Sequence, residues 1–124
     1  MGGHNEGIGR AGEYLCAYRL ELAGVRVAHV DVSGHDLWCR TPSGRLVSVQ
    51  VKATARSVLD SNGRLCYNFT RRVHENGPEV DVYGFVALDL GLVIFERDMR
   101  QRRRIAIGEF TVGAMEASVA RFFR

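Results

Sequence analysis

Residues 46–53 constrain the fold more tightly than any other segment, because valine recurs there at every second position, at residues 47, 49 and 51. Successive side chains of a β-strand point to opposite faces, so the valines share one face and Gln50 and Lys52 lie side by side on the other. A register shifted by one residue would turn Gln50 and Lys52 towards the core, which is costly for unpaired polar groups. The segment therefore predicts a strand with an apolar face and a polar patch near its end.

A β-hairpin is predicted around this strand. The alternation in residues 25–32 indicates a first strand, and residues 36–39 indicate a short second one. Residues 41–44 have proline at the second position and glycine at the fourth, the pattern of a type I turn. We therefore expect residues 36–39 and 46–53 to pair antiparallel across this turn.

The hairpin brings Asp36 towards the polar patch. In an antiparallel pair the start of one strand lies beside the end of the next, and cross-strand neighbours stand about 5 Å apart. Asp36 should therefore come near Gln50 or Lys52, so that an acid, an amide and an ammonium group can meet. The face of the sheet that Asp36 takes depends on the offset between the strands, which the sequence leaves open.

A helix is predicted before the hairpin, over residues 8–22, with Gly24 as its C-terminal stop. Its apolar residues recur at steps of three and four and form one stripe: Ile8, Ala11, Leu15, Tyr18 and Leu22. The opposite side is also partly apolar, with Cys16 and Leu20, and it carries Glu13. An acid in such a setting is partly desolvated and needs a partner, so Glu13 is a candidate functional residue.

The sequence after residue 53 predicts further strands and a final helix. Strands are expected at residues 65–69, 82–90, 92–95 and 104–107, a turn at 60–63, a loop at 71–78 and a helix at 111–123. Strands grouped between two helices are typical of an α+β or three-layer α/β domain. With 124 residues and no repeat or linker, residues 1–124 are expected to form a single domain.

Composition narrows the setting. The three cysteines are widely spaced without a CxxC pair, which argues against a disulfide framework or a zinc site and favours the cytoplasm. Neither a membrane span nor an apolar signal segment is present in the sequence, and the net charge is +3. Arginines cluster in two places, which either are solvated loops or contact phosphates: Arg71 with Arg72, and Arg100 with Arg102, Arg103 and Arg104.

The polar patch has the groups that phosphodiester hydrolysis requires. A hard divalent cation needs oxygen ligands, which Asp36 and the Gln50 amide can provide. A lysine such as Lys52 suits the role of a positive charge near the attacking water or the phosphate. Glu13 can add an outer ligand through water. The patch therefore indicates metal-assisted cleavage of nucleic acid.

These residues resemble the PD-(D/E)XK nuclease signature, preceded by a helical acid. More narrowly, residues 12–15, 34–37 and 49–53 are similar to the group I intron-associated, homing-type endonucleases of that superfamily, in which glutamine stands in place of the usual acid before the lysine. Residues 80–85 followed by 92–95 are similar to the later strand pair of those enzymes and of archaeal-type Holliday junction resolvases. The resemblance spans most of the chain.

The resemblance implies an α/β fold with a restriction-endonuclease-like αβββαβ core, a mixed sheet flanked by helices, and a metal-dependent endodeoxyribonuclease activity. Asp36 would bind Mg²⁺ or Mn²⁺ directly, together with the side-chain carbonyl of Gln50 and the backbone carbonyl of Val51. Lys52 would orient the attacking water or stabilise charge, and Glu13 would be the helical acid. The substrate would be duplex or branched DNA, cut by a homodimer or homotetramer because two strands need two active sites.

Two other functions fit the same residues. Because Gln50 brings no negative charge, a non-catalytic DNA-binding or assembly module with a nuclease fold is the first alternative. A Holliday junction resolvase is the second. Metal binding that depends on Asp36 separates the enzyme from the module, and a preference for four-way junctions separates the resolvase from the homing-type enzyme.

Overall fold

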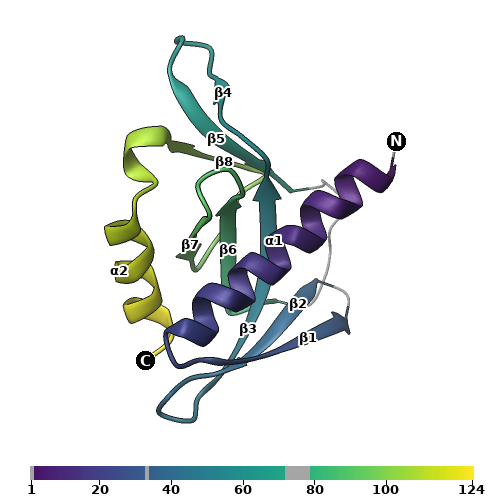
Figure 1. The fold of residues 1–124 in the computed structure, drawn as a ribbon, viewed down its shortest axis with the longest axis vertical. Coiled ribbons are helices and arrows are strands. Elements are labelled where there is room, and N and C mark those ends of the chain that lie inside the picture. The colour runs from purple at the N-terminus through teal and green to yellow at the C-terminus, as the bar shows by residue number, and fades with distance from the viewer. Residues whose placement is uncertain (1, 33, 72–78) are drawn as a thin grey trace.

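The computed structural model describes residues 2–32, 34–71 and 79–124. Its elements, in chain order, are α1 (Gly2–Leu22), β1 (Arg26–Val32), β2 (His35–Arg40), β3 (Leu46–Thr54), β4 (Val58–Leu59), β5 (Leu65–Thr70), β6 (Val82–Ala87), β7 (Leu92–Glu96), β8 (Arg102–Ala106), the short 3-10 helix η1 (Ile107–Glu109) and α2 (Val112–Phe122) (Figure 1). The predicted hairpin, later strands and final helix are all present.

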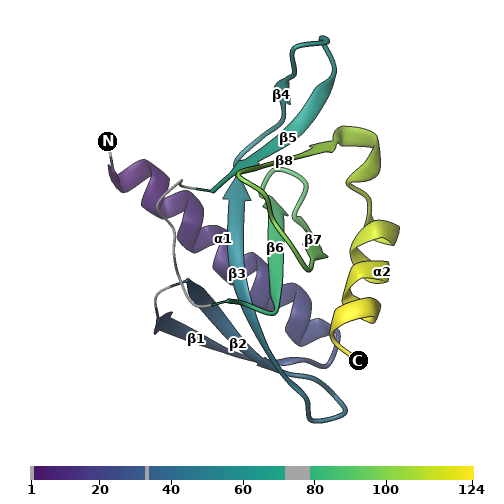
Figure 2. The same ribbon diagram turned by 180° about the vertical axis from the view of Figure 1, so that it is seen from behind.

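The strands form two sheets. The main sheet has five strands in the order β1-β2-β3-β6-β7, in which β3 and β6 run parallel and the other neighbours run antiparallel. A smaller antiparallel sheet has the order β4-β5-β8. Helix α1 crosses one face of the main sheet and α2 lies beside β7, as the front and back views show (Figures 1 and 2). The mixed sheet flanked by helices, expected from the sequence, is therefore confirmed.

Helix α1 packs through its side of small residues. Gly12 is buried, and a β-carbon there would overlap the β-carbon of Ala53 on β3. Cys16 and Leu20 are fully buried on the same side. The stripe predicted to pack on the rest of the protein is wrong at Tyr18, whose side chain is 55% exposed. Small residues allow the helix axis to approach the sheet closely, and the larger side chains are left on the outer flank.

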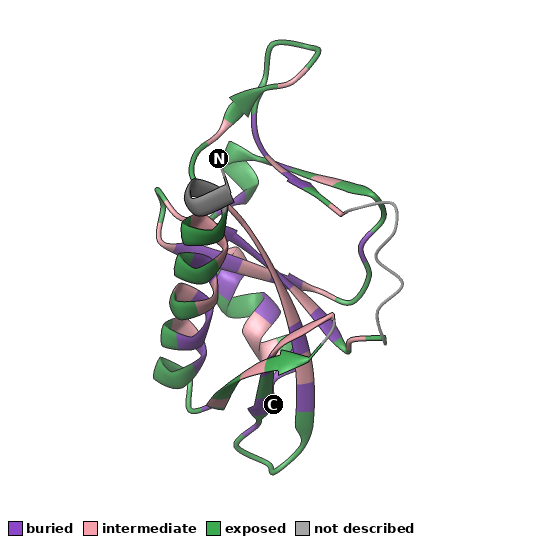
Figure 3. Cartoon of the chain, turned by 90° about the vertical axis from the view of Figure 1, so that its right-hand side faces the viewer, coloured by how far each residue is buried: buried purple, intermediate pink, exposed green. Residues whose placement is uncertain are grey.

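The second sheet covers part of the opposite face of the main sheet. Phe85 on β6 packs against Phe69 on β5, with ring centroids 5.0 Å apart, and Tyr67 packs against Phe110 at 5.2 Å. The β4–β5 hairpin projects beyond this core and is largely exposed, whereas the sheet side of α1 is buried or half-buried (Figure 3). The predicted turn at residues 60–63 is confirmed, because the Asp60 carboxylate accepts hydrogen bonds from the backbone N–H groups of the turn.

Helix α2 closes the edge of the main sheet. The Thr111 side chain caps its start by accepting from the Ala114 backbone N–H. Ser118 is buried and accepts a 3.0 Å hydrogen bond from the backbone N–H of Phe95 on β7. Because β7 is an edge strand, this hydroxyl satisfies a backbone donor that has no strand partner.

The second arginine cluster lies on a strand. Strand β8 begins at Arg102, two residues before the predicted start, and Arg102 pairs with Thr70 of β5. The strand expected from Arg104 onward is therefore confirmed, and the expectation of a loop is wrong for Arg102 and Arg103. Most of the predicted loop at residues 71–78 lies outside the described residues. In the part of the chain that the structure describes, no helix is long and apolar enough to cross a membrane.

The tight contact at Gly12 leads to a stability prediction. Gly12→Ala should lower the free energy of unfolding by about 1–3 kcal/mol, because the new methyl group would push α1 away from Ala53. Gly7→Ala, in the same helix with open space around it, should be neutral or stabilising by up to about 1 kcal/mol. Urea denaturation of both variants measures the difference. Equal stabilities would contradict the assigned helix–sheet contact.

Candidate functional site

The candidate site lies where β2 and β3 separate. The last residues paired at this end are Leu37 and Val49. Beyond them, the backbone N–H of Val51 donates a 2.7 Å hydrogen bond to Oδ2 of Asp36. The Asp36 carboxylate thus occupies the acceptor position beside β3 where the backbone pairing of β2 has ended. The two strands separate at Asp36, and the hydrogen bond from Val51 holds its carboxylate against β3.

Gln50 and Lys52 point away from α1. Val51 and Ala53 are the β3 side chains nearest to Gly12 of α1, so by alternation Gln50 and Lys52 take the other face. The faces predicted from the valine alternation are therefore confirmed. Both polar side chains are half-buried, and their partners on β6 are Tyr83 and Phe85. Tyr83 and Phe85 thus partly shield the Gln50 and Lys52 side chains from solvent.

Glu13 reaches the same region from α1. The close contact at the preceding residue holds this turn of the helix against β3, and Glu13 is half-buried. Burial raises the pKa of Glu13, and repulsion from Asp36 raises it further, with a smaller contribution from Asp31 against the opposing effect of Arg10. The pKa of the Cys16 thiol is also well raised, mainly by burial and in smaller part by Cys39, Asp36 and Glu13. Glu13 and Asp36 therefore lie in one electrostatic environment.

A hollow of about 640 Å³ opens beside Lys52, at the end of β3. Ile8 of α1 lines one part of it, and Thr70 of β5 lines another. Arg56, which follows β3, adds a second positive residue to the lining. A charged ligand in this hollow would touch Lys52 and groups from both layers of the fold.

The donor atoms at the strand separation suit a hard divalent cation. Asp36 and Glu13 are two carboxylates whose mutual repulsion a cation would relieve, and the Gln50 amide oxygen stays the further ligand predicted from the sequence. In the ranges 2–32, 34–71 and 79–124, no three His, Cys, Asp or Glu side chains form a group that could hold a metal ion. A cation here would therefore depend on neutral oxygen ligands beside the two acids, which Mg²⁺ and Mn²⁺ accept.

The arginines of the second cluster differ in their surroundings. Arg103 makes two hydrogen bonds to the Glu96 carboxylate, at 2.7 and 2.9 Å, and this contact raises its pKa. It therefore ties β8 to β7. Arg102 and Arg104 are exposed on the other side of β8, and Arg100, which precedes the strand, is also exposed.

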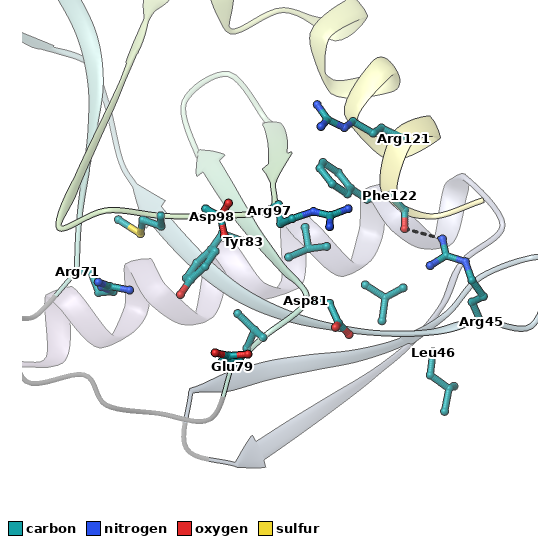
Figure 4. Close-up of a pocket in the computed structure, with 14 residues that line it drawn as sticks. Arg45, Leu46, Arg71, Glu79, Asp81, Tyr83, Arg97, Asp98, Arg121 and Phe122 are labelled. Atoms are coloured by element: carbon teal, nitrogen blue, oxygen red, sulfur yellow. Dashed lines mark hydrogen bonds between the residues drawn. The ribbon is translucent and has the colours of Figure 1, made fainter.

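The first arginine cluster borders a groove. Arg71 follows β5 and lines a groove of about 560 Å³ together with Tyr83 and with Arg97, which follows β7 (Figure 4). Arg72 lies outside the described residues. At the other end of the groove Arg45 is engaged in structure, since its guanidinium donates to the backbone carbonyl oxygens of Phe122 and Arg124. Arg97 is a candidate binding residue that sequence reasoning missed, because it is isolated in the sequence.

Asp81, directly before β6, is held by Ser48 of β3. Its Oδ2 accepts from the backbone N–H of Ser48 at 2.8 Å and from the Ser48 hydroxyl at 3.1 Å. The Ser48 hydroxyl also lies 3.0 Å from the Asp81 backbone N–H, which donates to it. Asp81 thus fastens the start of β6 to β3.

The chain has a nuclease-like mixed α/β fold, as a comparison with solved structures shows. It is similar to the structure of a bacterial homing endonuclease, I-Ssp6803I, with a TM-score of 0.61. The similarity covers 82% of this chain and 77% of the other, at 17% sequence identity. No family model matches the chain, and no curated protein matches it. At this level of identity the likeness establishes the fold alone.

The raised pKa of Glu13 gives a pH-dependent prediction. A carboxyl whose pKa is raised in the folded protein favours folding below its unfolded pKa, and this contribution is lost as pH rises through the folded pKa. Glu13→Gln should therefore melt at a higher temperature than the wild type at about pH 8 and at nearly the same temperature at about pH 4. Glu116→Gln, an exposed control on α2, should show no such difference. Differential scanning calorimetry at both pH values measures it, and a destabilised Glu13→Gln at pH 8 would contradict the shared acidic environment.

Proposed function

We propose that this chain is a Mg²⁺- or Mn²⁺-dependent endodeoxyribonuclease that hydrolyses phosphodiester bonds in DNA. The observation that carries the proposal is the Asp36 carboxylate held at 2.7 Å from the Val51 backbone N–H, with Gln50 and Lys52 on either side of that residue. Asp36 also raises the pKa of Glu13, which supports Glu13 as the helical acid of the proposed site. The nuclease-like fold supports the same conclusion.

Oxygen atoms of three residues would hold the metal. Asp36 would contribute a carboxylate oxygen, Gln50 its side-chain carbonyl and Val51 its backbone carbonyl. Glu13 would contact the site through water. A divalent cation in this position supplies positive charge to the scissile phosphate and lowers the pKa of a bound water.

Lys52 is proposed to place the attacking water and to stabilise negative charge that develops on the phosphate. Lys52 lies on β3 one residue beyond Val51, so its ammonium group is expected next to the proposed ligands. The hollow beside Lys52 provides space for a phosphate group. An ammonium ion is suited to this role because it is a compact charge with several donors.

DNA is proposed to contact the arginines around the site. Arg100, Arg102 and Arg104 are exposed and Arg71 is half-buried beside its groove, and Arg72 joins them as a proposal from the sequence. Arg103 belongs to the same cluster, but its pairing with Glu96 makes it a support for its neighbours. A homodimer or homotetramer would bring two active sites to the two strands. The three cysteines are free and buried, which suits the proposed cytoplasmic setting.

Cleavage of supercoiled plasmid tests the activity. The wild type should nick or linearise the plasmid with Mg²⁺ or Mn²⁺ and not with EDTA. Asp36→Ala and Lys52→Ala should each slow cleavage by about 10²-fold or more, because each removes charge stabilisation that is needed in the transition state. Glu116→Ala, on the outer face of α2, should cleave at the wild-type rate. Cleavage at the wild-type rate by Lys52→Ala would overturn the proposed site.

Calorimetric titration with Mn²⁺ separates the enzyme from a non-catalytic module of the same fold. The enzyme should give a binding heat that is lost in Asp36→Asn and weakened in Gln50→Ala, because the ligands of a hard cation are removed. A titration without heat in the wild type, combined with tight DNA binding, would favour the module. Faster cleavage of a four-way junction than of linear duplex would favour a resolvase.

A further inference from the structure

The face of the main sheet opposite α1 is only partly covered. Leu37, Cys39 and Val47 are buried on the α1 side, so their strand neighbours point to the opposite face. Two rows of cross-strand partners lie on that face: Arg26, Arg40 and Leu46, and next to them Ala28, Trp38 and Ser48. The small sheet that covers Phe85 does not shield these rows, since most of their residues are exposed.

This open face is concave and positively charged. It forms a hollow of about 540 Å³ lined by both rows, which we call the β1–β3 groove. The groove shares Leu46, Val47 and Asp81 with the groove that contains Arg71 and Arg97, so the two are contiguous. Asp81 is its acidic member, and that carboxylate is engaged by Ser48.

The two arginines of the β1–β3 groove are direct cross-strand partners. Arg26 pairs with Arg40, and both are exposed. Like charges placed opposite each other in a sheet are destabilising. Among the residues that the structure describes, neither arginine forms an ion pair with an acid. An anion that bridges the pair would remove the repulsion.

Trp38 supplies a fixed aromatic surface beside the arginines. Its side chain is 49% exposed, although it lies on a central part of the sheet. The indole Nε1–H donates a 3.0 Å hydrogen bond to Nδ1 of His35, the residue directly before Asp36. This bond holds the ring in one orientation and leaves its surface open to a ligand.

Strand β2 connects these residues to the candidate site. Trp38 and Arg40 occupy alternate positions of β2 and therefore share a face, and Asp36 lies two residues before Trp38 in the same strand. At about 3.4 Å per residue, Arg40 lies about 14 Å from Asp36 along the strand. A polyanion that passes Asp36 can therefore extend over Trp38 to the arginine pair.

We propose that the β1–β3 groove binds the backbone of duplex DNA next to the phosphate presented to Asp36, with Arg26 and Arg40 on phosphates and Trp38 packed against a sugar or base edge. This inference rests on the proposed nuclease function. Phosphate is favoured as the ligand by the repelling arginine pair, and aromatic and arginine side chains together are typical of nucleic-acid surfaces. A second copy docked face to face would bring the arginine pair near its symmetry mate, which is unfavourable.

Trp38 is the only tryptophan of the sequence, so its fluorescence reports on this groove alone. Acrylamide quenching is measured with a duplex oligonucleotide in EDTA, where cleavage does not interfere. Bound DNA should reduce the quenching constant. Shielding of Trp38 that grows with protein concentration in the absence of DNA would assign the face to a second copy and overturn the proposal.

Charge variants give an independent test. Arg26→Ala and Arg40→Ala should each reduce the slope of log binding constant against log salt concentration by about one, because each removes one phosphate contact. Both should melt at or above the wild-type temperature, since the like-charge pair is gone. Arg64→Ala, at the tip of the β4–β5 hairpin, removes the same charge and should leave the slope unchanged.

The outcomes separate this inference from the proposed function. If the protein cleaves DNA with metal but bound DNA leaves Trp38 unshielded, the proposed DNA contact in the groove is overturned and the nuclease proposal stands. Equal salt slopes in the Arg26, Arg40 and Arg64 variants would have the same meaning. A protein that neither binds nor cuts DNA would overturn both. Shielding of Trp38 together with reduced slopes in the Arg26 and Arg40 variants alone would establish the groove.

Discussion

The hydrogen bond from the Val51 backbone N–H to the Asp36 carboxylate is the interaction on which the arrangement of the site depends. It lies where β2 separates from β3. The Val51 N–H, which would otherwise pair with a backbone carbonyl of β2, donates to the carboxylate of Asp36. The bond fixes the acid beside Gln50 and Lys52 without further backbone pairing. With it, Asp36 takes a defined position against β3, and the opening between the strands has an acidic lining.

The packing of α1 provides the second constraint. Glycine at residue 12 allows the helix to lie against Ala53, and this brings the next residue, Glu13, close enough to Asp36 for the two carboxylates to repel each other. The small side chain of Cys16 continues the close approach, with its Sγ 3.4 Å from where a β-carbon of Gly84 would lie. The repulsion between Glu13 and Asp36 follows from this packing. A site of this kind stores unfavourable charge in the folded protein that a cation can neutralise.

Local patterns in the sequence were sufficient to predict much of this geometry. The valine alternation predicts the faces of β3, and the turn at residues 41–44 predicts which strands pair, so Asp36 was expected near Gln50 or Lys52 and is found bound to the Val51 N–H between them. The apolar stripe predicted for the first helix wrongly included Tyr18 and Leu22, which are exposed. Hydrophobicity favours these two residues for the packed face, but the helix approaches the sheet through the smallest residue, Gly12. The strand position of Arg102 and the exposure of Trp38 result from tertiary pairing, to which local pattern is insensitive.

Diffraction from crystals soaked in Mn²⁺, with anomalous scattering used to locate the ion, tests the proposed metal ligands. We expect one ion at about 2.2 Å from an Asp36 carboxylate oxygen, with the Gln50 amide oxygen and the Val51 carbonyl oxygen among its ligands. An ion bound elsewhere, with Asp36 still hydrogen-bonded to Val51 and Gln50 turned away from it, would contradict the account.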